Sequence, residues 1–379
     1  MAIGRIKFIL IPALLTLLLF VLLDKNFLPG LSRKNSSDDQ FRLVGSVAYL
    51  IRDEYVEEPN PSKTMDGAFR GLVDSLDILS SYLDKNAVLK YEQRRDTDLK
   101  DPGITLYKTY GSFPVVIGIR KNSPAEKAGL RIGESVSIMN GRSTLSMSML
   151  EANLLLKDKS TDPVTLKIMR GTGSEIVSLE RETIPAETYS YTTATGTSGI
   201  LKIRRLYAPC VNMLKENLLP DLKTKEKPLI LDLRDCAEGD IEEAQELLDI
   251  FSEDKESGYF ENGQGIRETL SLEATTELAD LPLIVWTNQA TIGPAEILAS
   301  VLKAYKKVKV IGFQTPGLVS KQHFIHLDDG SGLLLTSAIF HLKKDKDFWE
   351  KGLEPDIKID IEDMTSSAYL KATQKLLAN

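Results

Sequence analysis

The stretch that decides the fold of this chain is SPAEKAGLRIGESVSIMNG, residues 123–141. Ser123 is a typical helix cap, and Pro124 fits the first turn of a helix, where its missing N–H costs no hydrogen bond. Residues 135–142 (SVSIMNGR) predict a strand that ends in Asn140-Gly141, the dipeptide that most strongly indicates a tight hairpin turn. The stretch therefore predicts a short helix followed by a β-hairpin.

The segments on either side extend this pattern into a small β-rich domain. Residues 115–119 (VVIGI) predict a strand before the short helix, and residues 147–157 predict an amphipathic helix after the hairpin. Two more strands are expected at 164–170 and 175–180. This order of elements is similar to that of a PDZ domain, and the stretch quoted above resembles the bacterial form of that domain. We therefore expect a PDZ domain at residues 101–183.

The remaining residues predict a larger domain at 184–379. Residues 229–233, 282–287 and 308–312 are almost continuous apolar runs, as expected of strands that are buried on both faces. Helical patterns lie between these runs, so strands and helices alternate. This alternation predicts an α/β core.

The N-terminus predicts a membrane anchor that is separate from the folded domains. Residues 8–23 are uncharged, which is short for a spanning helix of about 20 residues, and no small-residue cleavage site follows them. We expect an uncleaved signal anchor or transmembrane segment at 1–29, with a cleaved signal peptide as the alternative. Positive charges lie on both sides of it, so charge alone does not determine its orientation. A polar linker at 30–39 and a helical region at 40–100 follow.

The composition excludes several classes of function. The 54 Asp and Glu of this 379-residue chain exceed its 47 Lys and Arg, and the net charge of −7 is opposite to that of a dedicated nucleic-acid-binding protein. Two cysteines and three histidines are too few for a disulfide framework or a zinc site. We expect Cys210 in the core and Cys236 in a turn, with a bridge between them as the alternative in an oxidising compartment. His323 and His326 face opposite sides of an expected strand. We therefore expect no metal and no cofactor.

From residue 40 to about residue 360, the chain resembles the carboxyl-terminal processing, or tail-specific, serine proteases. Besides the PDZ stretch, five segments occur in the family's order: GAFRGLVDSLDILSSYLD (67–84), LILDLRDCAEG (229–239), NQATIGPAEILASVLKAY (288–305), GFQTPGLVSKQ (312–322) and KGLEPDIKI (351–359). The resemblance implies an α/β core of the ClpP/crotonase-like type with an inserted PDZ domain. It also implies a serine nucleophile activated by a neutral lysine. Ile78-Leu79 stand where the family usually has Pro-His.

Several residues depart from the family's catalytic pattern. Alignment on the matching motifs places Gly293 where the nucleophilic serine is expected and Leu318 where the lysine is expected, while the helper Gln322 is retained. Glu238-Gly239 replace the glycine pair of the oxyanion turn, and a carboxylate there is expected to repel a developing oxyanion. Loss of the nucleophile alone lowers kcat by a factor on the order of 10^6. We therefore predict that the serine-type peptidase fold is kept and the activity is lost.

The alternative is an active serine-type endopeptidase with a relocated nucleophile. Thr291, Ser300 and Ser320 are the nearby hydroxyl residues, and Lys321 is three positions beyond Leu318. A three-residue offset on a strand turns Lys321 to the opposite face. We expect Thr291 to be a loop residue, Ser320 a strand residue and Lys321 a solvated charge.

The PDZ domain is the stronger candidate for function. Such domains add an extended peptide to a strand edge and hold its terminal carboxylate with backbone N–H groups. The matching loop here contains Gly103, Ile104, Thr105 and Leu106, of which only Gly103-Ile104 keep the family's glycine-rich pattern. A peptide-binding strand is expected near 106–108.

Together these features predict a pseudoprotease that is anchored by a single pass in the bacterial cytoplasmic membrane, with its folded part on the periplasmic side. Its expected partners are unfolded polypeptides, protein C-terminal tails, an active paralogue or another envelope protein. A third interpretation is a structural envelope protein whose PDZ domain stays closed on the core and binds no peptide.

Overall fold

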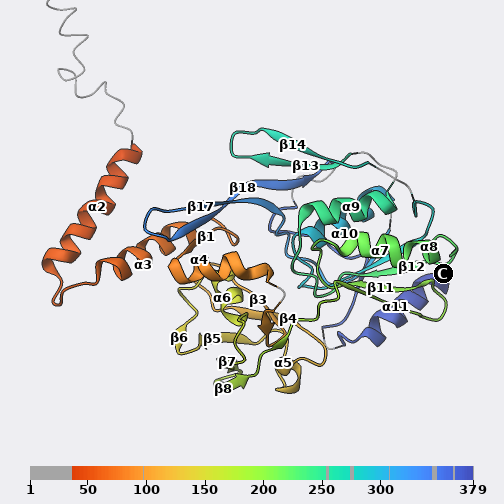
Figure 1. Ribbon diagram of the computed structural model, residues 1–379, viewed down its shortest axis with the longest axis horizontal. Helices are drawn as coiled ribbons and strands as arrows, with labels where there is room; N and C mark the ends of the chain where they lie inside the picture. Colours follow the sequence, from red (N-terminus) through yellow and green to blue (C-terminus); the bar gives the residue numbers. More distant parts are fainter. Residues whose placement is uncertain are drawn as a thin grey trace, which may run out of the picture. The chain divides into compact units, whose positions relative to one another are not determined.

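The computed structural model describes residues 36–96, 98–252, 256–273, 277–306, 308–343, 348–361 and 363–378 (Figure 1). The predicted anchor at 1–29 and the first part of the predicted linker lie outside the described residues. Within the described part of the chain, no helix is long and apolar enough to cross a membrane. The chain divides into two compact units at Met65-Asp66.

The first unit is helical in its described residues. Helix α2 (Ser36–Glu54) exposes several large apolar side chains, among them Leu43, Leu50 and Tyr49. Helix α3 (Pro61–Asp74) begins in this unit. Helices α2 and α3 agree with the helical pattern predicted from residue 40 onward, but the last residues of the predicted linker, 36–39, are also helical.

The same prediction is wrong for residues 81–83, which form strand β1 (Ser81–Leu83). This strand pairs antiparallel with β18 (Gly332–Leu342), about 250 residues later, so no local signal indicates it. Helix α4 (Lys85–Glu92) follows, capped by the Asp84 carboxylate, which accepts a hydrogen bond from Ala87 N at 2.9 Å. The short 3-10 helix η1 (Gln93–Arg95) then leads to the PDZ domain.

The PDZ domain has the predicted elements in the predicted order. Ser123 caps helix α5, and Asn140 and Gly141 both have positive φ, as the tight hairpin requires. The sheet order is β3-β4-β5-β7-β8, with β6 paired to β5, so β3 is an edge strand. The elements are β3 (Ile104–Tyr107), β4 (Val115–Ile119), α5 (Pro124–Lys127), β5 (Ser135–Met139), β6 (Arg142–Ser143), α6 (Met149–Leu156), β7 (Val164–Arg170) and β8 (Gly173–Leu179).

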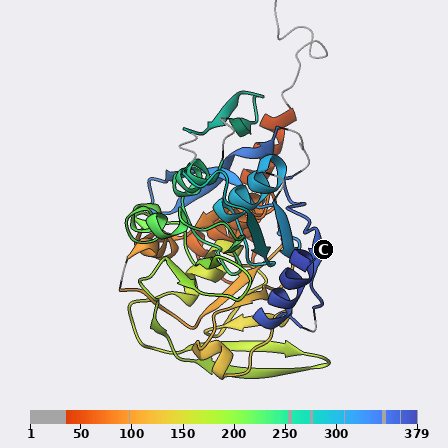
Figure 2. The ribbon, with the colours of Figure 1, turned by 90° about the vertical axis from the view of Figure 1, so that its right-hand side faces the viewer.

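Two short strands join the ends of this domain. β2 (Lys100–Asp101) pairs antiparallel with β9 (Glu182–Thr183), so the chain enters and leaves the domain at one place. In the second unit, Figure 2 shows the yellow and yellow-green PDZ strands on one side and the blue C-terminal helix α11 (Ser366–Ala378) beside the core.

The core contains the predicted α/β sheet. Its order is β10-β11-β12-β15-β16-β19, and every neighbouring pair is parallel except β10 with β11. The strands are β10 (Tyr189–Thr192), β11 (Gly199–Ile203), β12 (Leu229–Asp232), β15 (Leu283–Thr287), β16 (Lys309–Gly312) and β19 (Ile357–Lys358).

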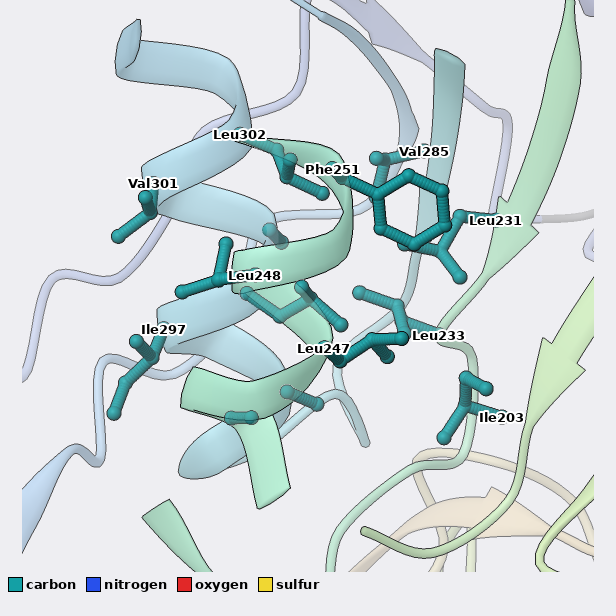
Figure 3. Close-up of a cluster of buried hydrophobic side chains, with 14 of the residues drawn as sticks. Ile203, Leu231, Leu233, Leu247, Leu248, Phe251, Val285, Ile297, Val301 and Leu302 are labelled. Carbon is teal, nitrogen blue, oxygen red and sulfur yellow. The ribbon is translucent and has the colours of Figure 1, made fainter. Parts of the chain in front are cut away.

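Alternate residues of this sheet pack against helices on its two faces. Leu231 and Val285 pack with α9 (Ile241–Phe251) and α10 (Pro294–Lys306), whose apolar side chains fill the space between helices and sheet in Figure 3. Ile230 and Trp286 point the other way and pack with Tyr369 of α11. Helices α7 (Cys210–Asn217) and α8 (Leu219–Leu222) extend the first cluster. Burial on both faces explains why these strands are apolar throughout.

A second sheet lies beside the core, and of its strands the sequence patterns predict only β17, which carries Ser320, His323 and His326. Its order is β1-β18-β13-β14, with β17 also paired to β18. The remaining strands are β13 (Glu256–Asn262), β14 (Arg267–Ser271) and β17 (Ser320–His326). Phe260 of β13 and Phe340 of β18 join the main core cluster.

Candidate functional site

The residues predicted to form the site line one cleft of about 1790 Å³. Gly293, Leu318 and Gln322 line it from the core, and Glu238 and Gly239 line it from the turn after β12. The PDZ residues 103–106 and helix α6 line its other side. The fold therefore brings together segments that are up to about 200 residues apart in the sequence.

Gly293 lies at the start of helix α10, in the loop after β15. Its φ of +63° is in the region that favours glycine. A Cβ placed on Gly293 would have only the Leu318 carbonyl oxygen nearby, at 3.7 Å. There is consequently space for a side chain at this position, but no side-chain chemistry is present.

The buried carboxylate of Glu296 holds this loop against the segment that contains Leu318. It accepts hydrogen bonds from the backbone N–H of Gly293 at 3.0 Å, of Gly317 at 2.6 Å and of Leu318 at 2.8 Å. Burial raises the pKa of Glu296 to about 7, although the Thr315 hydroxyl and the three backbone N–H groups favour the ionised form. Glu296 lies within the segment NQATIGPAEILASVLKAY, but no local sequence pattern indicates this role.

Leu318 lies in an apolar cluster, which we call the cleft cluster. Leu318 is 2% exposed and packs with Ile117 of β4 and with Ala290 and Ile292 of the loop before α10. Partly buried residues complete the cluster: Ile78, Leu79, Tyr107, Met149 and Ala237. The position predicted for a proton-accepting lysine is thus packed with hydrocarbon from both the PDZ domain and the core.

Gln322 and Leu79 connect the same region to the segment before the PDZ domain. Gln322 Nε2 donates a hydrogen bond to the Leu79 carbonyl oxygen at 2.8 Å. Ile78-Leu79, Gly293 and Leu318 are departures from the family's pattern at three distant places in the sequence. In the folded chain Ile78 and Leu79 pack in the cleft cluster with Leu318, beside Gly293.

The nearby hydroxyl and amine groups have other partners, with one exception. Thr291 is fully buried, and its Oγ1 donates to the Leu233 carbonyl at 2.9 Å and accepts from Asn288 N at 3.0 Å. Ser300 Oγ donates to the Ile297 carbonyl at 3.1 Å. The Lys321 ammonium forms an ion pair with the Glu268 carboxylate at 2.5 Å, whereas the sequence predicts a charge in contact with solvent only. Of these four residues, only Ser320 has a buried side-chain oxygen with no hydrogen-bond partner among the described residues.

The turn after β12 is fixed by polar contacts. Arg234 forms two hydrogen bonds to Asp232, at 2.8 and 2.7 Å, and lies over the rings of Trp286 and Tyr369. Asn288 accepts from Asp235 N at 3.0 Å and donates to Asp235 Oδ1 at 2.8 Å. These contacts set the position of the turn after β12 relative to the loop that precedes Gly293.

The carboxylate of Glu238 in this turn is paired. Its carboxylate forms an ion pair with Lys157, which follows helix α6 of the PDZ domain. Burial would raise the pKa of Glu238, but Lys157 outweighs it and holds that pKa below its usual value. Gly239 has no room for a side chain, because a Cβ would lie 2.5 Å from the Leu206 Cβ. The turn is thus tied to the PDZ domain.

The cysteines and histidines form no second site. Cys210 and Cys236 are both buried as free thiols, so the bridge considered above is absent from the structure. Burial raises the pKa of Cys236, which keeps the thiol protonated and unreactive. His323 and His326 are exposed on β17, and no cluster of metal-ligating side chains occurs among the described residues.

Comparison with known proteins identifies the class. The family model described as Peptidase family S41 matches residues 199–359, and the PDZ domain model matches residues 99–169. The fold is therefore the S41 peptidase fold with a PDZ domain.

Individual relatives show which kind of S41 peptidase this chain is similar to. The chain is 28% identical over 346 residues to the "Carboxy-terminal processing protease CtpA" of Bacillus subtilis (strain 168), covering 90% of this chain and 74% of the relative. It is 26% identical over 355 residues to a "Probable CtpA-like serine protease" of Staphylococcus aureus (strain COL), covering 93% and 71%. The structure of a photosystem II D1 C-terminal processing protease has the same fold, with a TM-score of 0.71, 21% identity, and coverage of 89% of this chain and 91% of that one. Over 90% of its length the chain is thus similar to a carboxy-terminal processing protease, and it carries a PDZ domain.

Proposed function

We propose that this chain is a non-proteolytic member of the family that binds polypeptide tails in its cleft. The observation that carries the proposal is the packing of Leu318 in the cleft cluster, beside a glycine at position 293. A leucine cannot accept a proton, and a glycine has no nucleophile. Both positions follow from the family resemblance, so the proposal rests on that alignment.

The contacts of the neighbouring polar groups support the same proposal. Thr291 already donates its only hydroxyl proton to a backbone carbonyl, and Lys321 is engaged by a carboxylate. Neither is poised as the second half of a dyad, which needs a nucleophile within hydrogen-bond reach of its base. Ser320 is the one of these hydroxyl residues that favours the alternative of an active endopeptidase, because it is a lining residue of the cleft and its buried Oγ has no partner among the described residues.

The geometry of the PDZ domain supports the binding part. Strand β3 is an edge strand, and residues 103–106 line the cleft together with helix α6. An extended tail could therefore add to β3 and continue toward Gly293 within one continuous cleft. Unfolded chains or protein C-terminal tails are the partners that fit this shape.

One set of contacts favours the interpretation as a structural protein. Strand β4 of the PDZ domain approaches the core so closely that a Cβ on Gly118 would lie 2.9 Å from the Ala290 Cβ. With the Lys157–Glu238 ion pair, this contact supports a PDZ domain that stays docked. The absence of any peptide binding would distinguish this function from the proposed one.

The cellular setting is also proposed and rests on the sequence pattern alone. The apolar residues 8–23 support a single-pass anchor in a bacterial cytoplasmic membrane, with the domains on the periplasmic side. An active paralogue or an envelope protein would then be within reach as a partner.

The test uses an unstructured substrate protein with an apolar C-terminal tail. The full chain, purified in mild detergent, is compared with the Gly293→Ser, Leu318→Lys double variant and with Thr291→Ala and Ser320→Ala. We expect the natural chain to bind the substrate without cleaving it. Cleavage by the natural chain that is lost in Thr291→Ala or Ser320→Ala would contradict the proposal and identify the relocated nucleophile.

A further inference from the structure

The edge of strand β3 that faces helix α6 carries a contact that the sequence patterns do not indicate. Asn153 of α6 accepts a hydrogen bond from Leu106 N on its Oδ1 at 3.1 Å and donates one from its Nδ2 to Leu106 O at 3.0 Å. Nδ2 also donates to Met149 O at 2.9 Å, within the same helix. One side-chain amide thus holds both backbone groups of Leu106.

These two backbone groups are the ones that a bound tail would need. In an antiparallel pair, a residue whose N–H and C=O point to the same edge exchanges both bonds with one residue of the added strand. Leu106 lies at the end of the loop expected to hold a terminal carboxylate, on a strand whose other edge is already paired with β4. The Asn153 amide offers the same acceptor and donor as one residue of a peptide.

We propose that the Asn153 side chain occupies the peptide-binding edge of the PDZ domain until a tail displaces it. The inference rests on the proposed tail-binding function and adds a requirement to it. A ligand that displaces Asn153 must supply both an acceptor for Leu106 N and a donor for Leu106 O in order to replace the two hydrogen bonds that Asn153 made. A tail that lacks either group loses a hydrogen bond on binding.

The position of Asn153 suits a side chain that can leave. It is only partly buried and lines the cleft, whereas Leu106 itself is 1% exposed and belongs to the PDZ core. Release of Asn153 therefore changes one rotamer and leaves the packing of β3 intact. Met149, one turn before Asn153, packs in the cleft cluster, so the edge lies beside the position of Leu318.

The test measures the binding of a labelled synthetic peptide with an apolar C-terminal residue and a free carboxylate to the full chain. Asn153→Ala removes both hydrogen bonds to Leu106, and Asn153→Leu removes them while filling the same space. Asn212→Ala is the matched control, because Asn212 is an exposed residue of helix α7 in the core. We expect roughly a tenfold lower Kd for both Asn153 variants and no change for the control, since two hydrogen bonds of ordinary net strength need no longer be displaced.

Hydrogen exchange of residues 103–108 gives a second readout. The Leu106 amide should exchange slowly in the natural chain, faster in Asn153→Ala, and slowly again when the peptide is added. Equal affinities for the natural chain and both variants would overturn the inference and leave the proposed tail binding intact. If no variant binds the peptide, both the inference and the proposed function are wrong.

Discussion

Replacing Glu296 with glutamine should remove a pH dependence from the stability of the core. Glu296 is fully buried, and its carboxylate joins the loop at Gly293 to the segment at Gly317-Leu318 through three backbone hydrogen bonds. Its pKa is raised from an ordinary value of 4.5 to about 7 by burial. Glutamine keeps the shape of the side chain and does not titrate.

The sign and the size of the effect follow from the two pKa values of Glu296. As pH rises from about 4.5 to 7, the unfolded chain loses this proton before the folded chain does, so the free energy of unfolding decreases. The stability that protonated Glu296 contributes is fully present below the pKa of the unfolded chain, and it is lost as pH rises through the pKa of the folded chain. The difference between about 7 and 4.5 corresponds to roughly 3 kcal/mol.

The assay is urea unfolding of both proteins at about pH 5 and about pH 8, followed by the fluorescence of Trp286, which is buried in the same core. Glutamine at position 296 turns one N–H toward a backbone donor, which costs a constant amount at each pH. The test is therefore whether the stability difference between the natural chain and Glu296→Gln changes with pH. Glu242→Gln is the control, because Glu242 is exposed in the first turn of α9. A stability difference between natural chain and Glu296→Gln that is the same at both pH values would refute it.

Four further outcomes are expected. Leu318→Ala should destabilise the chain by about 2–5 kcal/mol in denaturant unfolding, because it opens a cavity in the cleft cluster; a loss below about 1 kcal/mol would mean that the cluster is not packed as described. Thr291→Val should cost about 1–3 kcal/mol, since it leaves buried backbone groups unpaired, and should leave peptide affinity unchanged. Lys157→Met should cost at most about 1 kcal/mol, because the Glu238 side chain is 34% exposed, and should increase protease cleavage between the PDZ domain and the core; unchanged cleavage would show that the ion pair does not hold the two together. Cys236 should not react with a thiol reagent in the native chain and should react in urea, and rapid native labelling would contradict its burial.

The PDZ domain could be predicted element by element because its signals are local. The Ser123-Pro124 cap, the Asn140-Gly141 turn and the alternation of 164–170 each depend on neighbours within a few residues, and each was confirmed. The parallel strands of the core were also predictable, since strands that are buried on both faces are apolar throughout.

Apart from strand β17, the second sheet could not be predicted in this way, and neither could the polar contacts of the cleft. Strand β1 is three residues long and exists because β18 pairs with it. The sequence does not indicate that Glu296 is buried. Two of its three hydrogen-bond partners, Gly317 and Leu318, lie in a loop about 20 residues later, so its surroundings depend on how that loop packs. The contact of Asn153 with Leu106 spans 47 residues and follows only from how α6 packs on β3.

The sequence by itself determined the chemistry that is available in this protein, because a residue's functional groups do not depend on folding. Glycine at 293 and leucine at 318 have neither nucleophile nor base wherever they lie, and the resemblance to the family gives these positions their meaning. Only the tertiary structure decided what occupies the cleft. Contacts between distant segments bury Leu318 against the PDZ domain, pair Glu238 with Lys157 and place Asn153 on the edge of β3, and such contacts depend on the packing of whole domains.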